Sequence, residues 1–157
     1  MSAKKNIIAL RQKKAIIEKG GGEKAIEKQL AMGKMTARDR IRALLDEGSF
    51  HEYDLFVQHE EKNFGMDTKD LPGDGVITGT GSINGNPVCI YAQDFTVMGG
   101  SLGIQHARKI TKIMDHALKM KMPCIGINDS EVHVFRKELA HWRVMAKFFI
   151  ATLWLPV

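Results

Sequence analysis

The chain begins with apolar positions at helical spacing, separated by glycines. One helix is predicted for residues 3–19, and Gly20–Gly22 is expected to end it and to make a flexible joint. A second helix is predicted for residues 23–32. A third begins at Thr36, whose hydroxyl can cap it, and is expected to continue to Gly48. The first fifty residues are therefore predicted to form a helical arm. Because the apolar faces of its helices are small, the arm must pack on another surface to be stable.

The period changes to that of β-strands in the middle of the chain. Tyr53–Val57 is a short strand candidate, and Pro72–Gly75 has the residues of a turn. Val76–Ile83 alternates as a strand does, Asn84-Gly85 is a strong hairpin signal, and Pro87–Ala92 is the returning strand. The sequence therefore predicts an antiparallel hairpin.

A helix and a further strand follow the hairpin. The helix is predicted for residues 102–120, with His106, Arg108 and Lys109 on its exposed face, and Pro123–Ile127 has the pattern of a short buried strand. This order fits a ββα unit of an α/β fold, with more strands after it. The predicted core residues of this part are Ile110, Ile113, Met114, Ala117, Leu118, Met120 and Met122.

Composition and charge indicate a globular protein. The chain has 157 residues, of which 44% are hydrophobic and 26% charged, which excludes disorder, collagen and coiled coil. The net charge is +5, but residues 1–50 hold twelve Lys and Arg against six acidic residues, whereas residues 51–130 hold seven against ten. The basic residues alternate with acidic and apolar ones, and Phe50 is the one aromatic residue among the first fifty. A solvated helix face or an anionic small ligand is therefore favoured over nucleic acid.

Membrane and disulfide signals are missing from the sequence pattern. No apolar run reaches the length of a membrane span, and the N-terminal segment has no apolar stretch long enough for a signal peptide. Cys89 and Cys124 give neither a disulfide framework nor a metal-ligand spacing. We therefore expect a cytoplasmic protein with no metal site and no membrane span.

The segment between the returning strand and the next helix carries the candidate chemistry. Gly99, Gly100 and Ser101 come just before the helix, where backbone N–H groups and the helix dipole could hold an anion or a thioester oxygen. Phe95 and Thr96 lie on the same approach. The alternative is a tight turn in which Ser101 is the helix N-cap.

Five segments stand out, in order, between residues 15 and 130. They are GGGEKAIEKQLAMGKMTARDRIRALLDEGSF (Gly20–Phe50), FGMD (Phe64–Asp67), GDGVITGTGSINGNPV (Gly73–Val88), AQDFTVMGGSLG (Ala92–Gly103) and GINDS (Gly126–Ser130). Together they resemble the biotin-dependent acyl-CoA carboxyltransferases. Within that family the resemblance is greatest to the propionyl-CoA carboxylase beta chains, the methylmalonyl-CoA carboxyltransferases and the methylmalonyl-CoA decarboxylase alpha chains.

The resemblance implies a crotonase-like fold made of repeated ββα units, of which this chain would hold the N-terminal part. Residues 1–50 would be a helical arm and residues 51–130 a partial carboxyltransferase domain. The implied activity is carboxyl transfer between carboxybiotin and an acyl-CoA, with biotin carried on a biotin carboxyl carrier protein and none attached to this chain. Other carboxyltransferase chains, arranged in the family's hexamer, are further expected partners.

The same resemblance gives the candidate residues their role. Phe95, Thr96, Gly99, Gly100 and Ser101 are expected to bind the acyl-CoA. The family takes its oxyanion amides from later segments, so no catalytic residue is assigned and the chain is expected to be inactive alone. The segments that select the acyl group also come later in the family, so the acyl group is left open.

Other polar residues have both a functional and a structural interpretation. Lys34, Arg38 and Arg40 could face the phosphates of CoA, but a solvated helix face is favoured. Asp94 and Asp129 follow strands, where capping is favoured over proton transfer.

Residues 131–157 depart from the family pattern. The family continues with a segment like GGARIQEG, whereas this chain reads EVHVFRKELAHWRVMAKFFIATLWLPV. With suitable codons, one G restored in front of the tail makes the same letters read GGARIQEGIGSLAGYGEIFYRNTLASG. We therefore expect a frameshift after Ser130, with a native tail helix as the alternative. A gene with no missing base at this point would contradict the frameshift.

Two other functions stay open. The chain could be a non-catalytic fragment that associates with carboxylase subunits through its helical arm. It could also be a small basic protein that binds nucleic acid, which the acidic middle of the chain disfavours.

Overall fold

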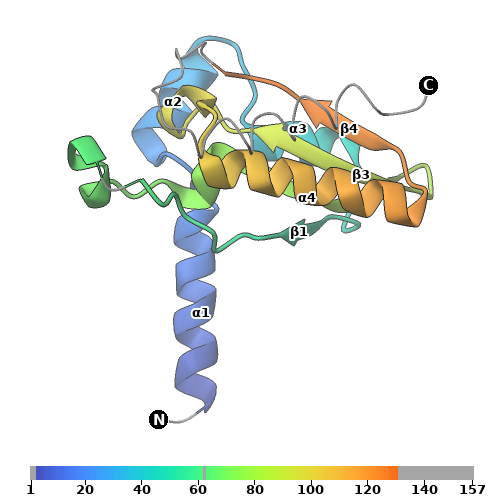
Figure 1. The fold of residues 1–157 in the computed structure, drawn as a ribbon, viewed down its shortest axis with the longest axis horizontal. Coiled ribbons are helices and arrows are strands. Elements are labelled where there is room, and N and C mark those ends of the chain that lie inside the picture. Colours follow the sequence, from blue (N-terminus) through green and yellow to red (C-terminus); the bar gives the residue numbers. More distant parts are fainter. Residues whose placement is uncertain (1–2, 62, 131–157) are drawn as a thin grey trace.

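The computed structural model describes residues 3–61 and 63–130, so the predicted tail lies outside the described residues. Their centre is a four-stranded sheet in the order β1-β2-β3-β4 (Figure 1). β1, β2 and β3 are antiparallel neighbours, whereas β4 runs parallel to β3. The strands are β1 (His51–Tyr53), β2 (Val76–Ile83), β3 (Asn86–Gln93) and β4 (Cys124–Ile127).

The described residues also form four α-helices and three short 3-10 segments. α4 connects β3 to β4, because a pair of parallel strands needs a long crossover connection. The predicted order of hairpin, helix and strand is thus confirmed. The helices are α1 (Ala3–Ile17), α2 (Glu23–Ala31), α3 (Ala37–Leu44) and α4 (Ile104–Met120), and the 3-10 segments are Asn63–Thr68, Pro72–Gly75 and Met98–Gly100.

Side-chain alternation along β3 gives the sheet two packed faces. Val88 and Ile90 lie in a cluster with α3, whereas Cys89 and Tyr91 lie in a cluster with α4. α3 is therefore part of the core of the sheet, although it belongs to the first fifty residues. The side chains that α3 and its C-cap contribute are Ala37, Ile41 and Leu45.

The hairpin between β2 and β3 turns at Asn84 and Gly85, whose φ angles are 50° and 77°. Two positive φ angles in a two-residue loop are what the predicted Asn-Gly turn requires. Asp46 holds this turn from outside, because its carboxylate accepts hydrogen bonds from Ser82 Oγ at 2.6 Å and from both turn amides at 2.9 Å. The hydrogen bond from Ser82 and those from the amides lower the pKa of Asp46.

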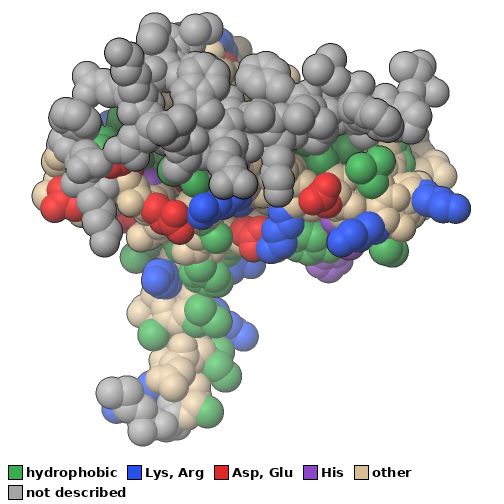
Figure 2. Space-filling view, viewed as in Figure 1, with side chains coloured by type: hydrophobic (Ala, Val, Ile, Leu, Met, Phe, Trp, Pro, Cys, Tyr) green, Lys and Arg blue, Asp and Glu red, His purple; other side chains and the backbone are tan. Residues whose placement is uncertain are grey.

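α1 projects away from the rest of the described chain (Figure 1). Its sequence holds five Lys and Arg and no acidic residue, and Ile17 is its one buried residue. Figure 2 shows hydrophobic and basic side chains side by side along this helix. The large apolar side chains that α1 exposes are Ile7, Ile8, Leu10 and Ile16, at 52, 47, 54 and 63%.

Some predicted elements are wrong in extent. The strand expected at Tyr53–Val57 ends at Tyr53, because Asp54 has a φ of 56° and turns the chain. The third helix ends at Leu44 rather than Gly48, although Thr36 caps it as predicted by accepting from Asp39 N at 3.2 Å. Two of the predicted core residues of α4, Leu118 and Met120, are 52 and 58% exposed.

Candidate functional site

β3 and β4 are parallel, so their carboxyl ends meet at the same edge of the sheet. In open α/β sheets, ligands commonly bind outside the carboxyl ends of the strands. Residues 94–101 leave this edge after β3 and residues 128–130 leave it after β4. All five predicted acyl-CoA residues lie in the first of these segments, which we call the β3 loop (residues 94–101).

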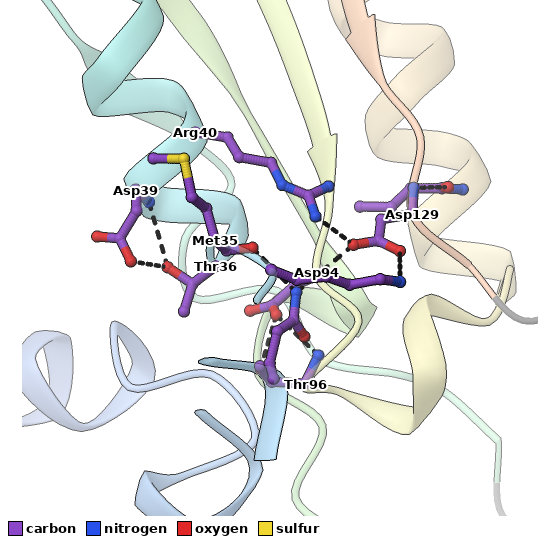
Figure 3. A network of polar contacts seen from close by, with 10 residues as sticks. Met35, Thr36, Asp39, Arg40, Asp94, Thr96 and Asp129 are labelled. Carbon is purple, nitrogen blue, oxygen red and sulfur yellow. Dashed lines mark hydrogen bonds and ion pairs between the residues drawn. The ribbon is translucent and has the colours of Figure 1, made fainter. Parts of the chain in front are cut away.

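The β3 loop begins with a turn that is closed by a side chain. Asp94 Oδ1 accepts from Thr96 N at 3.0 Å and from Thr96 Oγ1 at 2.6 Å (Figure 3). This confirms capping as the role of Asp94. Thr96 Oγ1 also accepts from Gly21 N at 3.0 Å, so the Thr96 hydroxyl is held on two sides.

The second half of the β3 loop is a left-handed turn. Met98, Gly99 and Gly100 have φ angles of 48°, 63° and 64°. Gly100 N donates to Val97 O at 3.0 Å and Ser101 N donates to Met98 O at 3.2 Å. These two amides are used within the turn, so they do not form the anion cradle that the sequence suggests.

The N-terminus of α4 is occupied by a carboxylate of the protein. The helix N-cap is Gly103, and Asp74 Oδ2 accepts from His106 N at 2.8 Å. A Cβ at Gly103 would lie 2.4 Å from the same oxygen, so this close approach requires glycine. The alternative in which Ser101 caps the helix is therefore wrong, and the end of the helix dipole already faces a carboxylate.

Two α4 residues that were expected on the surface are buried. His106 is 0% exposed and its Nδ1–H donates to Asp74 O at 2.9 Å. Lys109 is 3% exposed and its ammonium group donates to Gly73 O at 3.0 Å and to Val76 O. Burial lowers the pKa of His106 to about 4 and that of Lys109 to about 8, and it raises the pKa of Asp74. We call Asp74, His106 and Lys109 the α4 cluster.

A second charged cluster lies near the carboxyl end of β4, where Asp129 pairs with two cations. Arg40 from α3 donates to Asp129 Oδ2 at 2.6 Å, and Lys34 lies 3.3 Å from Oδ1 (Figure 3). The buried Gln29 donates to Met35 O at 3.0 Å and reaches Asp129 Oδ2 at 3.5 Å. Asp129 is therefore an ion-pair partner rather than a cap. We call Lys34, Arg40 and Asp129 the Asp129 cluster.

The cations that were expected on a solvated face have specific partners. Arg38 makes a bidentate pair with Glu52, at 2.7 and 3.0 Å, and Arg40 is paired as described above. Lys34 also lies over the ring of Phe95, with Nζ 4.9 Å from the ring centroid. The side chain of Lys34 is 45% exposed, whereas that of Arg40 is 22% exposed. Lys34 is thus the more exposed cation of this cluster.

Gln93, the last residue of β3, joins the two clusters. Its Nε2 donates to His106 Nε2 at 3.4 Å, because the other ring nitrogen of His106 carries the proton that Asp74 O accepts. Gln93 Oε1 accepts from Asp129 N at 3.0 Å. Gln93 was not among the predicted site residues, although its place directly before Asp94 at a strand end was the available signal.

A pocket of about 160 Å³ opens beside the β3 loop. Ser101 lines it, whereas Phe95, Thr96, Gly99 and Gly100 do not. Its other walls are mostly apolar, with His59, Glu60, Glu61 and Asp74 as polar groups. The five predicted residues therefore lie in one loop, but this pocket is lined by Ser101 alone among them.

Residues 3–61 and 63–130 carry neither a metal-ligand cluster nor a helix that could span a membrane. These residues contain no group of three or more His, Cys, Asp and Glu side chains that could hold a metal ion. None of their helices combines the length and the apolar character that a bilayer crossing needs.

Curated relatives match much of this chain. The methylmalonyl-CoA decarboxylase subunit alpha of Veillonella parvula is 54% identical over 129 residues, which are 82% of this chain and 25% of the relative. The propionyl-CoA carboxylase beta chain of Cereibacter sphaeroides is 54% identical over 121 residues, or 77% of this chain and 24% of the relative. This chain therefore spans about a quarter of the length of these relatives.

A solved structure and a family model agree with these relatives. The structure of transcarboxylase 12S with methylmalonyl-coenzyme A and methylmalonic acid bound covers 96% of this chain, with a TM-score of 0.91 and 39% identity, and this chain covers 30% of it. This likeness confirms the predicted fold. The family model described as carboxyl transferase domain matches residues 28–149. That match runs past Ser130 and does not mark the expected break there, so the frameshift stays a prediction.

Proposed function

The chain belongs to the carboxyl transferase domain family, and from this premise we propose that it forms the N-terminal part of an acyl-CoA carboxyltransferase. The proposed reaction moves a carboxyl group between carboxybiotin and an acyl-CoA of the propionyl-CoA and methylmalonyl-CoA type, in the cytoplasm. In the forward direction the N–C bond of carboxybiotin breaks, a bond forms to the α-carbon of the acyl-CoA, and the α-proton passes to the ureido nitrogen.

One observation carries this proposal. The transcarboxylase 12S structure with methylmalonyl-coenzyme A bound is 39% identical to this chain, in a match that covers 96% of this chain. The proposed partners are a biotin carboxyl carrier protein, which supplies the carboxyl group, and other carboxyltransferase chains. Transcarboxylase 12S assembles as a hexamer, which supports the second of these partners.

We assign the β3 loop to the acyl-CoA side of the site. Lys34 and the ring of Phe95 offer a half-exposed cation and an aromatic face, which suit a phosphate and a nucleotide base. Thr96, Gly99, Gly100 and Ser101 follow in the same loop. The amides of Gly100 and Ser101 donate within their own turn and do not fit the role of oxyanion donors. The chain is therefore expected to bind an acyl-CoA without transferring a carboxyl group alone.

Calorimetric titration of the purified chain with methylmalonyl-CoA, propionyl-CoA and CoA tests the binding. We expect all three compounds to bind, whereas ATP, which lacks the pantetheine arm that they share, binds more weakly. A folded chain that binds none of the three would overturn the proposal. A second assay follows transfer of labelled carboxylate from free carboxybiotin to propionyl-CoA, and measurable turnover would show that the chain is active alone.

A non-catalytic assembly role is the second candidate, and the exposed apolar residues of α1 favour it. A 15-residue helix with one buried residue is expected to gain stability by packing on a partner. Affinity capture with this chain as bait, from cells that contain full-length carboxylase chains, tests the role. Retention of those chains by the wild type and loss of retention in Ile7→Glu/Ile8→Glu would support it. Failure to retain any carboxylase chain would contradict it.

A further inference from the structure

The Gly20–Gly22 turn, which joins α1 to α2, packs directly on the β3 loop. Gly21 N donates to Thr96 Oγ1 at 3.0 Å, and Thr96 Oγ1 donates to Asp94 Oδ1 at 2.6 Å. The joint that the sequence predicted to be flexible is thus attached to the candidate site by two successive hydrogen bonds.

Neither of the first two glycines has room for a side chain. A Cβ at Gly21 would lie 1.8 Å from Thr96 O, and a Cβ at Gly20 would lie 2.6 Å from Asp94 Oδ2. Gly20 has a φ of 54°, whereas Gly21 does not have a positive φ. A substitution at Gly21 therefore tests the contact with the β3 loop and not backbone strain.

The β3 loop has a second close contact, with the segment after β4. A Cβ at Gly100 would lie 2.3 Å from Asp129 O, so the left-handed turn packs against the second residue after β4. The β3 loop thus packs on both the Gly20–Gly22 turn and Asp129.

We infer that Gly21 is a positioning residue of the acyl-CoA site, which acts by fixing Phe95 and Thr96 through its N–H and its missing side chain. This inference rests on the proposed function, because it takes Phe95 and Thr96 as acyl-CoA contacts. Gly21 itself touches no ligand. Its effect reaches the ligand through the Thr96 hydroxyl and carbonyl, with which it is in direct contact.

The test compares Gly21→Ala with Gly79→Ala in the full chain. Gly79 is the matched control because a Cβ there also meets a backbone oxygen, His51 O at 2.3 Å, without a positive φ. That contact lies between β1 and β2, away from the β3 loop. Both variants are expected to melt at a lower temperature. At a temperature where both are folded, we expect Gly21→Ala to bind methylmalonyl-CoA about tenfold more weakly or worse, because a displaced contact loses its geometry. Gly79→Ala is expected to bind within about twofold of the wild type.

The outcomes separate the inference from the proposed function. If the wild type binds no acyl-CoA, both are overturned. If Gly21→Ala binds like the wild type, or if Gly79→Ala loses as much affinity, the inference alone is overturned. Should Gly21→Ala fail to fold, the amide resonance of Gly21 in the wild type decides the question. A shift of that resonance on addition of methylmalonyl-CoA supports the inference, and an unchanged resonance in a chain that binds the compound contradicts it.

Discussion

The α4 cluster and the Asp129 cluster both contact Gln93, but they differ in how deeply their ionisable side chains are buried. Asp74, His106 and Lys109 are 6, 0 and 3% exposed, and apart from the contact between His106 and Gln93 their hydrogen bonds go to the backbone of a turn and a helix end. In the Asp129 cluster, Lys34 and Arg40 keep 45 and 22% of their side chains exposed. The first cluster is therefore buried within the fold, whereas the second keeps part of its charge exposed.

The difference follows from the cost of burying ionisable groups. A buried charge is tolerated only where its polar neighbours replace water, and removal of one partner leaves the others unpaired. A charge that keeps part of its hydration loses less when its partner is removed. We therefore expect substitutions in the α4 cluster to lower stability and substitutions at Lys34 to change binding.

The largest effect is expected for Asp74→Ala. It removes the carboxylate that accepts from His106 N, lies beside the buried Lys109 and occupies the start of α4. Ala would also be strained at the φ of 50° that Asp74 adopts. We expect a loss of about 3 kcal/mol or more in the free energy of unfolding, measured in urea. Asp74→Asn keeps an acceptor oxygen and tolerates this φ, so it should lose less. A loss below about 1 kcal/mol for Asp74→Ala would contradict the structural role of the α4 cluster.

The next effect is a dependence of stability on pH. The pKa of His106 is lowered to about 4, chiefly by burial, from an ordinary value of 6.5. Between these values the unfolded chain binds a proton at this residue that the folded chain does not bind. The free energy of unfolding should therefore rise with pH across this window, by up to about 1.4 kcal/mol per pH unit. The raised pKa of Asp74 acts in the opposite direction at the acid end of the window.

His106→Gln should flatten the rise of stability with pH, whereas His51→Gln, at an exposed position, should keep it. Urea unfolding at several pH values between 4.5 and 7 measures the slope for each variant. Equal slopes in the wild type and in His106→Gln would show that other groups cause the dependence.

The pattern of the chain predicted the sheet well because the relevant signals are local. Alternation in Val76–Ile83 and the Asn84-Gly85 pair specify the hairpin without reference to distant residues. The burial of His106 was missed, although its spacing to Ile110 and Ile113 places it on the buried stripe of α4. His106 was expected on the surface because it is polar. The residue that satisfies it in the interior, Asp74, is more than thirty residues away in sequence and could not be paired with it from the pattern.

The position of the β3 loop was predicted, but its hydrogen bonds were not. The sequence located the β3 loop at a strand end, where Phe95 and Thr96 do lie. It carried no sign that the Gly100 amide is used within its own turn, because that depends on left-handed φ angles. It also could not place Gly21 on Thr96 or Arg40 on Asp129, since these contacts span 75 and 89 residues.

A moderate effect is expected for Asp129→Asn. The carboxylate is 11% exposed and is shared by Arg40 and Lys34, so its loss removes the ionic partner that these two cations have among the described residues. Because both cations reach water, we expect a loss of about 1–2 kcal/mol in the free energy of unfolding, smaller than for Asp74→Ala. Glu18→Gln is the control, since its pair with Lys14 is exposed and spans 3.7 Å. A loss for Asp129→Asn as small as that for Glu18→Gln would show that the Asp129 cluster does not stabilise the fold.

The smallest effect on stability is expected for Lys34→Ala, because surface ion pairs contribute about 0.5 kcal/mol. Binding should respond more strongly: if Lys34 meets a CoA phosphate, the variant should bind methylmalonyl-CoA several-fold more weakly at low salt, and the difference should shrink at high salt. Lys19→Ala, which breaks a more exposed pair with Glu23, should leave both stability and binding near the wild-type values. Calorimetric titrations at two salt concentrations measure this effect. A Lys34→Ala variant that loses stability but binds methylmalonyl-CoA unchanged would show that Lys34 has a structural role. The contrast between the two clusters would then be wrong, because Lys34 is the residue that most distinguishes them.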